Sequence, residues 1–261
     1  MLDLKNISKT FGKGTVNVHQ VFGGLSLHIE KGDFVSIIGA NGAGKSTLFN
    51  VIAGSIIPDE GLVELDGDDI TMLPEHVRAK TIGRLFQDPM RGSAPGLSIE
   101  ENLALAAGRG GWFSHITRAD RKAFRDRLAM LDMGLEDRMN QPVGLLSGGQ
   151  RQALTLMMAT FNPPKLLLLD EHTAALDPAT ADKVMAITDK TVKENGLTCL
   201  MITHNMTTAL EFGNRTLMMD RGRIIFDTCG EERSKLTVPD LLDKFRENAG
   251  KNLDNDRMLL S

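Results

Sequence analysis

A glycine-rich loop that ends in lysine and serine is the strongest chemical signal in the chain. Gly39, Gly44, Lys45 and Ser46 match the pattern G-x4-G-K-S, and the loop follows an apolar run at 34–38 and precedes a helix-like segment. In this context backbone N–H groups can turn inward around phosphate groups, and the helix start adds partial positive charge. Lys45 would reach the β- and γ-phosphates of a nucleotide, and the Ser46 hydroxyl would bind Mg²⁺. The pattern therefore predicts a nucleotide site rather than a chance glycine loop.

Two adjacent carboxylates follow a second apolar run at 166–169. Acids just beyond a buried strand lie at the carboxyl edge of a sheet, where they can reach a metal ion and water. Asp170 would hold Mg²⁺, directly or through its water shell, and Glu171 would polarise the water that attacks the γ-phosphate. Taken alone, such a pair is more typical of a turn or a helix cap. Together with the phosphate loop, it predicts catalytic carboxylates.

Hydrophobic periodicity indicates the elements that must position these groups. The N-terminal third alternates apolar and polar residues, which is typical of strands. After the middle, strands and helices alternate, and this order favours an α/β fold with parallel strands and crossover helices. The middle itself, 99–139, predicts helices with one apolar face. The expected strands are 2–7, 25–29, 34–38, 61–67, 166–169 and 198–202. The expected helices include 47–53, 151–161 and 179–194, and a terminal helix carries Leu241, Leu242 and Phe245. A hairpin is expected to join 217–219 to 224–226.

Composition argues against several other classes of protein. The chain has 261 residues, a net charge of −4 and 41% hydrophobic residues, which fits a soluble globular protein with no general drive toward nucleic acid. Cys199 and Cys229 form no CxxC pair, so neither a disulfide framework nor a cysteine metal site is expected. No secretory signal opens the chain, and no apolar run approaches the roughly 18 residues that span a bilayer. A role at a membrane would therefore need a second polypeptide.

The pentapeptide LSGGQ at 146–150 stands after the helix-rich middle and before the acidic strand. It resembles the signature sequence of ABC-type ATPases, and the resemblance covers about residues 1–230. It implies a P-loop NTPase core with an antiparallel β subdomain and an α-helical signature subdomain at about 90–160. Residues 231–261 would form a C-terminal helix and tail.

The resemblance implies roles for further residues. Gln87 would be the Q-loop glutamine that senses Mg²⁺ and couples to a transmembrane partner, and His204 would be the switch histidine at the γ-phosphate. Phe11 would stack on adenine, although an aromatic residue near a strand end is also an ordinary core residue. Asp177 would belong to the D-loop at a dimer interface.

In this family two ATPase subunits face head to tail, so that each ATP lies between one subunit's phosphate loop and the other subunit's signature. A complete site would therefore need a second copy of the chain. The residues expected in catalysis are Glu171, His204, Lys45 and Gln87. Those expected at Mg²⁺ are Ser46, Gln87 and Asp170. The residues expected to contact ATP are Phe11, Gly39, Asn41, Gly42, Ala43, Gly44, Lys45, Ser46, Thr47, Ser147, Gly148, Gly149, Gln150 and Asp177.

The implied function is ATP hydrolysis coupled to transport. The chain would be the ATP-hydrolysing subunit of an ABC importer of a small solute such as an amino acid. It would work at the cytoplasmic face of the cell membrane with transmembrane permease subunits and, indirectly, a substrate-binding protein, and without nucleic acid. The alternative is a soluble ABC ATPase of cofactor assembly. The intact Lys45, Asp170, Glu171 and His204 argue against a non-catalytic scaffold.

Two features leave alternatives open. His172 stands where the family usually has proline, and it would be either a tolerated surface substitution or a residue that tunes the water or the interface near Glu171. Trp112 and Phe113 fall in the expected helical subdomain. They would form either a docking anchor for the partner or a small satellite core.

Overall fold

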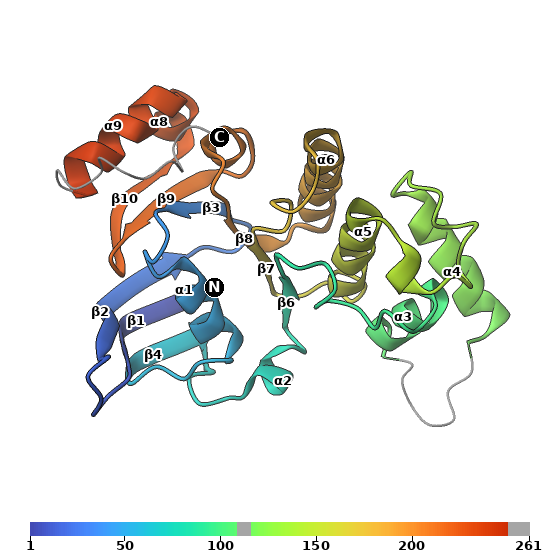
Figure 1. The fold of residues 1–261 in the computed structure, drawn as a ribbon, viewed down its shortest axis with the longest axis horizontal. Helices are drawn as coiled ribbons and strands as arrows, with labels where there is room; N and C mark the ends of the chain where they lie inside the picture. Colours follow the sequence, from blue (N-terminus) through green and yellow to red (C-terminus); the bar gives the residue numbers. More distant parts are fainter. Residues whose placement is uncertain (109–115, 250–261) are drawn as a thin grey trace. The chain divides into compact units, whose positions relative to one another are not determined.

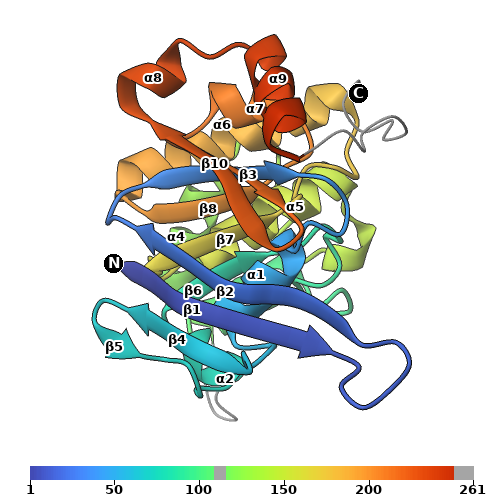
Figure 2. The ribbon, with the colours of Figure 1, turned by 90° about the vertical axis from the view of Figure 1, so that its left-hand side faces the viewer.

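The computed structural model describes residues 1–108 and 116–249 (Figures 1 and 2). The chain forms two compact units, residues 1–82 with 196–261 and residues 83–195. Both units combine helices with strands, which confirms the predicted α/β class. Trp112 and Phe113 lie outside the described residues. Within the described ranges, no helix combines the length and apolarity needed to cross a bilayer.

An antiparallel sheet in the first unit has the strand order β2-β1-β4-β5 (Figure 2). Leu2, Leu4 and Ile7 of β1 are all buried, although the step from Leu4 to Ile7 breaks the period of two. Asn6 accommodates this step, because its positive φ of 53° accompanies a register shift between Leu4 and Ile7. The strands are β1 (Leu2–Phe11), β2 (His19–Ile29), β4 (Glu60–Leu65) and β5 (Asp68–Asp69).

A second group of strands in the first unit places β3 between β8 and β9, with β10 on the outer side of β9. Strand β3 runs parallel to both neighbours, and β9 and β10 form the predicted antiparallel hairpin. Every residue from Phe34 to Ile38 is buried, as expected for a strand covered on both faces. The strands are β3 (Phe34–Gly39), β8 (Thr198–Ile202), β9 (Arg215–Asp220) and β10 (Arg223–Cys229).

Four helices of the first unit pack on these strands, with α1 and α7 against β3 and α8 and α9 against β10. The predicted terminal helix is confirmed as α9, whose Leu241 and Phe245 are buried in one cluster with Ile38, Ala209 and Met218. The helices are α1 (Lys45–Ala53), α2 (Glu75–Arg78), α7 (Met206–Glu211), α8 (Gly230–Ser234) and α9 (Val238–Ala249).

The second unit has an apolar core of its own, and its helices have the single buried face that the sequence predicts. Strand β7 neighbours β6. Strand β6 begins at Ile82, the last residue of the first unit's N-terminal part, and its other residues belong to the second unit. The elements are β6 (Ile82–Leu85), α3 (Ile99–Ala106), α4 (Arg118–Ala129), the 3₁₀ helix η1 (Val143–Leu145), α5 (Gly148–Ala159), β7 (Leu166–Asp170) and α6 (Pro178–Asn195). The buried core residues are Ile99, Leu103, Ala104, Phe124, Leu128, Leu131, Leu135, Met139, Val143, Leu146, Ala153, Leu154 and Met157.

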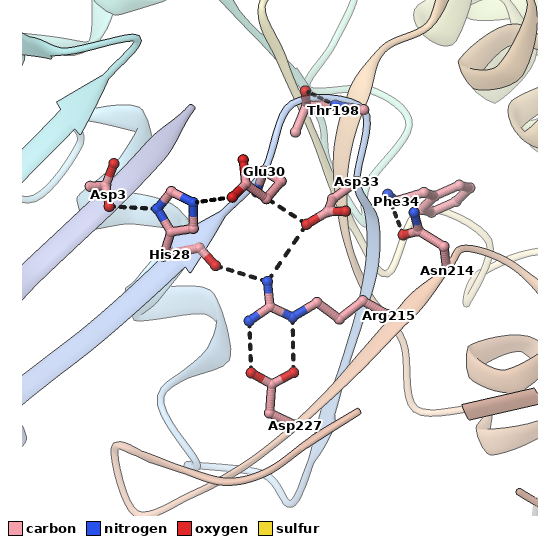
Figure 3. Close-up of polar contacts among 10 residues, drawn as sticks. Asp3, His28, Glu30, Asp33, Phe34, Thr198, Asn214, Arg215 and Asp227 are labelled. Atoms are coloured by element: carbon pink, nitrogen blue, oxygen red, sulfur yellow. Dashed lines mark hydrogen bonds and ion pairs between the residues drawn. The ribbon is translucent and has the colours of Figure 1, made fainter. Parts of the chain in front are cut away.

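A polar network joins strand ends in the first unit (Figure 3). The Nδ1 and Nε2 atoms of His28 lie 2.6 Å from Asp3 and 3.1 Å from Glu30, respectively. The Arg215 guanidinium makes a bidentate pair with Asp227, at 2.8 and 2.7 Å, and donates to the carbonyl oxygen of His28 at 2.8 Å. The network therefore ties β1 to β2 and β2 to the β9–β10 hairpin.

Candidate active site

The phosphate loop begins where β3 ends, and its glycines have conformations that other residues rarely adopt. Gly39 has a φ of 150° and Gly44 a φ of 101°. A Cβ atom on Gly39 would overlap with the carbonyl oxygen of Met219, and one on Gly44 would lie 2.9 Å from the Phe22 ring. Glycine is therefore required at both ends of the loop by backbone conformation and by close packing.

The Lys45 side chain is bound to the first two residues of this loop. The residue is only 5% exposed, and its Nζ donates to the carbonyl oxygens of Gly39 at 2.6 Å and Ala40 at 3.0 Å. Ser46, the next residue, is exposed, and the first turn of α1 contains no acidic residue that would repel phosphate. The loop thus places a cation and a helix N-terminus together, which is an arrangement that binds polyphosphate.

His204 lies at the same sheet edge as the phosphate loop. Strand β8 is parallel to β3, with Ile202 opposite Ile37, and the Thr203 N–H donates to the Ile37 carbonyl at 3.2 Å. Both strands therefore end on one edge, with Gly39 as the last residue of β3 and His204 two residues after the end of β8. The structure brings these two predicted site residues to the same edge.

Phe11 ends β1 and is 38% exposed, so the interpretation of Phe11 as a core residue is wrong. The Lys9 Nζ lies 5.7 Å from the centre of its ring. An exposed ring at a strand end is available for stacking, and its role at adenine stays a prediction.

In the second unit, the two carboxylates stand at the end of β7 as predicted. The β7 residues before Asp170 are fully buried, and Asp170 is partly exposed. Its Oδ2 lies 3.4 Å from Nη2 of Arg84, a strand residue that the sequence analysis missed. Glu171 has a positive φ of 47°, so the chain turns sharply at the proposed catalytic carboxylate.

The signature segment begins helix α5 with a capping box. The Ser147 hydroxyl accepts from the Gln150 N–H at 3.3 Å, and the Gln150 side chain accepts from the Ser147 N–H at 3.2 Å. A Cβ on Gly149 would overlap with Cγ2 of Thr180, at the start of α6. Asp177 caps that helix by accepting from the Thr180 N–H at 3.1 Å. The signature and D-loop residues are therefore packed against each other within the second unit.

Gln87 is exposed just after β6. The segment before it is held by Gln152, whose Nε2 donates to the carbonyl oxygen of Phe86 at 3.3 Å. Arg151 in turn donates to the carbonyls of Val143 and Gly144, which precede the signature, and of Leu146, its first residue. Neither Gln152 nor Arg151 was predicted to position these loops.

Comparison with known proteins agrees with this arrangement of motifs. Residues 22–174, more than half of the chain, match the family described as ABC transporter. The chain belongs to the ABC transporter family. The fold and the ATPase activity predicted from the sequence are thereby confirmed: this ABC ATPase binds ATP and hydrolyses it.

Relatives and solved structures extend the match over nearly the whole ABC ATPase. The tyrosine transport ATP-binding protein of Clostridioides difficile is 43% identical over 94% of this chain and 98% of the relative. The methionine import ATP-binding protein MetN 2 of Enterococcus faecalis is 33% identical over 100% of this chain and 74% of the relative. A dimeric ATP-binding cassette in a post-hydrolysis state, bound to ADP and Pi, has a TM-score of 0.75 and 31% identity, covering 88% of this chain and 98% of that chain.

The burial of His172 in this ABC ATPase excludes one of its two interpretations, the tolerated surface substitution. The residue is only 2% exposed, so it is not a surface substitution. Its Nε2 lies 3.2 Å from the Thr188 hydroxyl, which itself donates to the Val184 carbonyl at 2.8 Å. The hydroxyl therefore accepts from a protonated Nε2. Burial lowers the pKa of His172 to about 4, and the ring is neutral at physiological pH.

Proposed function

We propose that this ABC ATPase energises the import of an amino acid, with tyrosine or a close aromatic analogue as the substrate. The observation that carries the proposal is its 43% identity, across 98% of the relative, to a tyrosine transport ATP-binding protein. Identity to the methionine import relative is lower, at 33%. The permease and a substrate-binding protein would contact the transported molecule, and the ATPase would not. The ATPase would therefore be linked to one substrate only because it binds the permease for that substrate.

Within the site, the loop of Gly39 to Thr47 would enclose the phosphates, and Lys45 would neutralise their charge. The packing of Gly39 and Gly44 supports this role, because it fixes the loop before nucleotide binds. Glu171 would accept hydrogen bonding from the attacking water, and His204 would contact the γ-phosphate. Both residues follow strands whose buried residues fix their position.

The oxygen donors expected at Mg²⁺ are the Ser46 hydroxyl, the Gln87 amide oxygen and the Asp170 carboxylate. They fit the ion chemically, because Mg²⁺ prefers hard oxygen ligands and usually combines few protein groups with phosphate and water. Among the described residues, no group of three or more histidine, cysteine, aspartate or glutamate side chains could hold a metal ion on its own. When bound, Mg²⁺ would neutralise charge on the phosphate oxygens.

Two copies of the chain would close around two ATP molecules. The helix start at Ser147 supports this arrangement, because the N-terminus of α5 carries partial positive charge that favours a phosphate group of the facing ATP. Transmembrane permease subunits would then hold the pair at the cytoplasmic face of the membrane.

Transport by the purified complex tests the proposal. The chain would be isolated with its partners from detergent-solubilised membranes and reconstituted in vesicles, and ATP-dependent uptake of radiolabelled tyrosine and methionine would be compared. We expect tyrosine uptake with wild-type chain and none with Glu171→Gln. Glu231→Gln, an exposed carboxylate on α8, is the matched control and should transport normally.

Recovery of soluble partners alone would contradict the transport assignment and would favour the cofactor-assembly alternative. Uptake of methionine in preference to tyrosine would overturn only the choice of substrate.

A further inference from the structure

The short helix α7 begins two residues after His204. His204 stands between the end of β8 and the N-cap of α7, Asn205, whose side chain accepts from the Thr208 N–H at 3.0 Å. The Asn205 N–H in turn donates to the Thr203 hydroxyl at 3.1 Å. Because only one residue separates His204 from the first turn of α7, a shift of this helix would move the histidine.

Arg233 of α8 holds the opposite end of α7. Its Nη2 donates to the carbonyl oxygens of Ala209 at 2.9 Å and Phe212 at 2.6 Å, and its Nε donates to the Thr216 hydroxyl at 2.9 Å. Phe212 is the C-cap residue of α7. A cation at the carbonyl end of a helix satisfies open acceptors and opposes the helix dipole.

The environment of Arg233 is unusual for a charged side chain. The residue is only 8% exposed, and its partners among the described residues are carbonyl and hydroxyl oxygens rather than carboxylates. A buried guanidinium without an ionic partner carries a desolvation cost, which the hydrogen bonds to α7 offset. Its geometry is therefore specific to α7 and β9.

Apolar packing adds a second restraint on the same helix. Leu241 and Phe245 of α9 share a buried cluster with Ala209, and Met206 and Leu210 of α7 pack against that cluster. Ala40 of the phosphate loop packs against it as well. Helix α9 thus shares one buried cluster with the helix that follows His204 and with a residue of the loop that would hold phosphate.

We infer that Arg233 is a positioning residue for ATP hydrolysis, which fixes α7 and through it the switch histidine His204. This inference rests on the role proposed above for His204. The hydrogen bonds of Arg233 are made to α7 and β9 rather than to the phosphate loop. Its loss should therefore lower kcat and leave nucleotide affinity largely intact.

A double-mutant cycle on the full-length chain tests the inference. The variants are Arg233→Met, His204→Ala and their combination, with Lys235→Ala, at the exposed C-cap position of α8, as the control. We expect Arg233→Met to lower kcat by about 10- to 100-fold, as misplacement of a reacting group does, with the KM for ATP nearly unchanged. In the His204→Ala background, Arg233→Met should cause no further loss.

Thr216→Val provides a milder variant in case Arg233→Met does not fold. It removes one acceptor of Arg233 and should lower kcat in wild-type chain but not in His204→Ala. Equal loss in both backgrounds, or unchanged kcat in a folded variant, would overturn the role of Arg233. If His204→Ala itself retained full hydrolysis, the proposed role of His204 would fail, and the inference with it.

Discussion

At the scale of single residues, the site depends on positions where only one kind of side chain fits. The sequence pattern predicted the glycines of the phosphate loop, because the motif demands them wherever it occurs. The sequence could not predict what surrounds such glycines, for example Phe22 against Gly44 of the phosphate loop or Thr180 against Gly149 of the signature. Contacts between segments far apart in the chain leave no periodic signal.

Gly149→Ala should destabilise the second unit by about 1–3 kcal/mol, because the new methyl group would overlap with Cγ2 of Thr180. Thr180→Ser removes that methyl group and keeps the hydroxyl, so the double variant should recover most of the lost stability. Urea unfolding of the variants measures both effects. Gly148→Ala is the control, since its Cβ would lie 3.1 Å from Cδ2 of Leu176, the end of a flexible side chain. Failure of Thr180→Ser to rescue would contradict the packing account.

The buried His172 predicts a loss of stability in acid. Its pKa is about 4 in the folded chain and near the ordinary 6.5 when unfolded, so the unfolded chain binds more protons between these values. Stability should therefore fall by roughly 3 kcal/mol in total as the pH drops from above 6.5 to 4. Unfolding of wild type and His172→Gln across this range measures the contribution. The same acid-side slope in both proteins would contradict it.

At the scale of elements, the long strands and helices were predictable and the short ones were not. Strand β3 and helix α6 have enough apolar residues to display their period. Strand β6 has only four residues and buries its first and last, which matches neither alternation nor a continuous run. Its Arg84, which pairs with Asp170, was missed for that reason. The capping box of Ser98 and Glu101 was a usable signal for the start of α3.

The pairing of β1 with β2 should depend on pH through His28. Its hydrogen bond with Asp3, followed by that with Glu30, raises the pKa of His28, while the hydrogen bond from His28 lowers the pKa of Asp3. Because the pKa of His28 is higher in the folded chain than in the unfolded chain, protonation of His28 stabilises the fold at pH values below the unfolded pKa, near 6.5. This contribution is lost as the pH rises through the pKa of the folded chain. His28→Gln should therefore cost most stability at low pH and little at high pH.

Denaturant unfolding between pH 5.5 and 8.5 measures this difference, with His19→Gln on the same strand as the control. A difference that grows with pH would contradict the role given to His28 in Figure 3.

At the scale of the whole molecule, the motifs fall into two sets on two compact units. The first unit holds the phosphate loop and His204, and the second holds Asp170, Glu171, the signature and Asp177. The sequence predicted both sets because each motif is local. The domain limits at 230 and at about 90–160 stay predictions. Residues that brace the motifs, such as Arg233 and Gln152, could not be predicted, since their partners are distant in sequence.

The proposed function requires that two copies of this ABC ATPase form a shared, ATP-closed site in which Glu171 activates water. The direct measurement is the mass of purified Glu171→Gln in solution with ATP and Mg²⁺, compared with ADP, alongside its rate of phosphate release. We predict a stable dimer with ATP, a monomer with ADP and loss of turnover, with Lys45→Ala forming no dimer in either nucleotide. A Glu171→Gln chain that stays monomeric with ATP, or hydrolyses it at the wild-type rate, would contradict the claim.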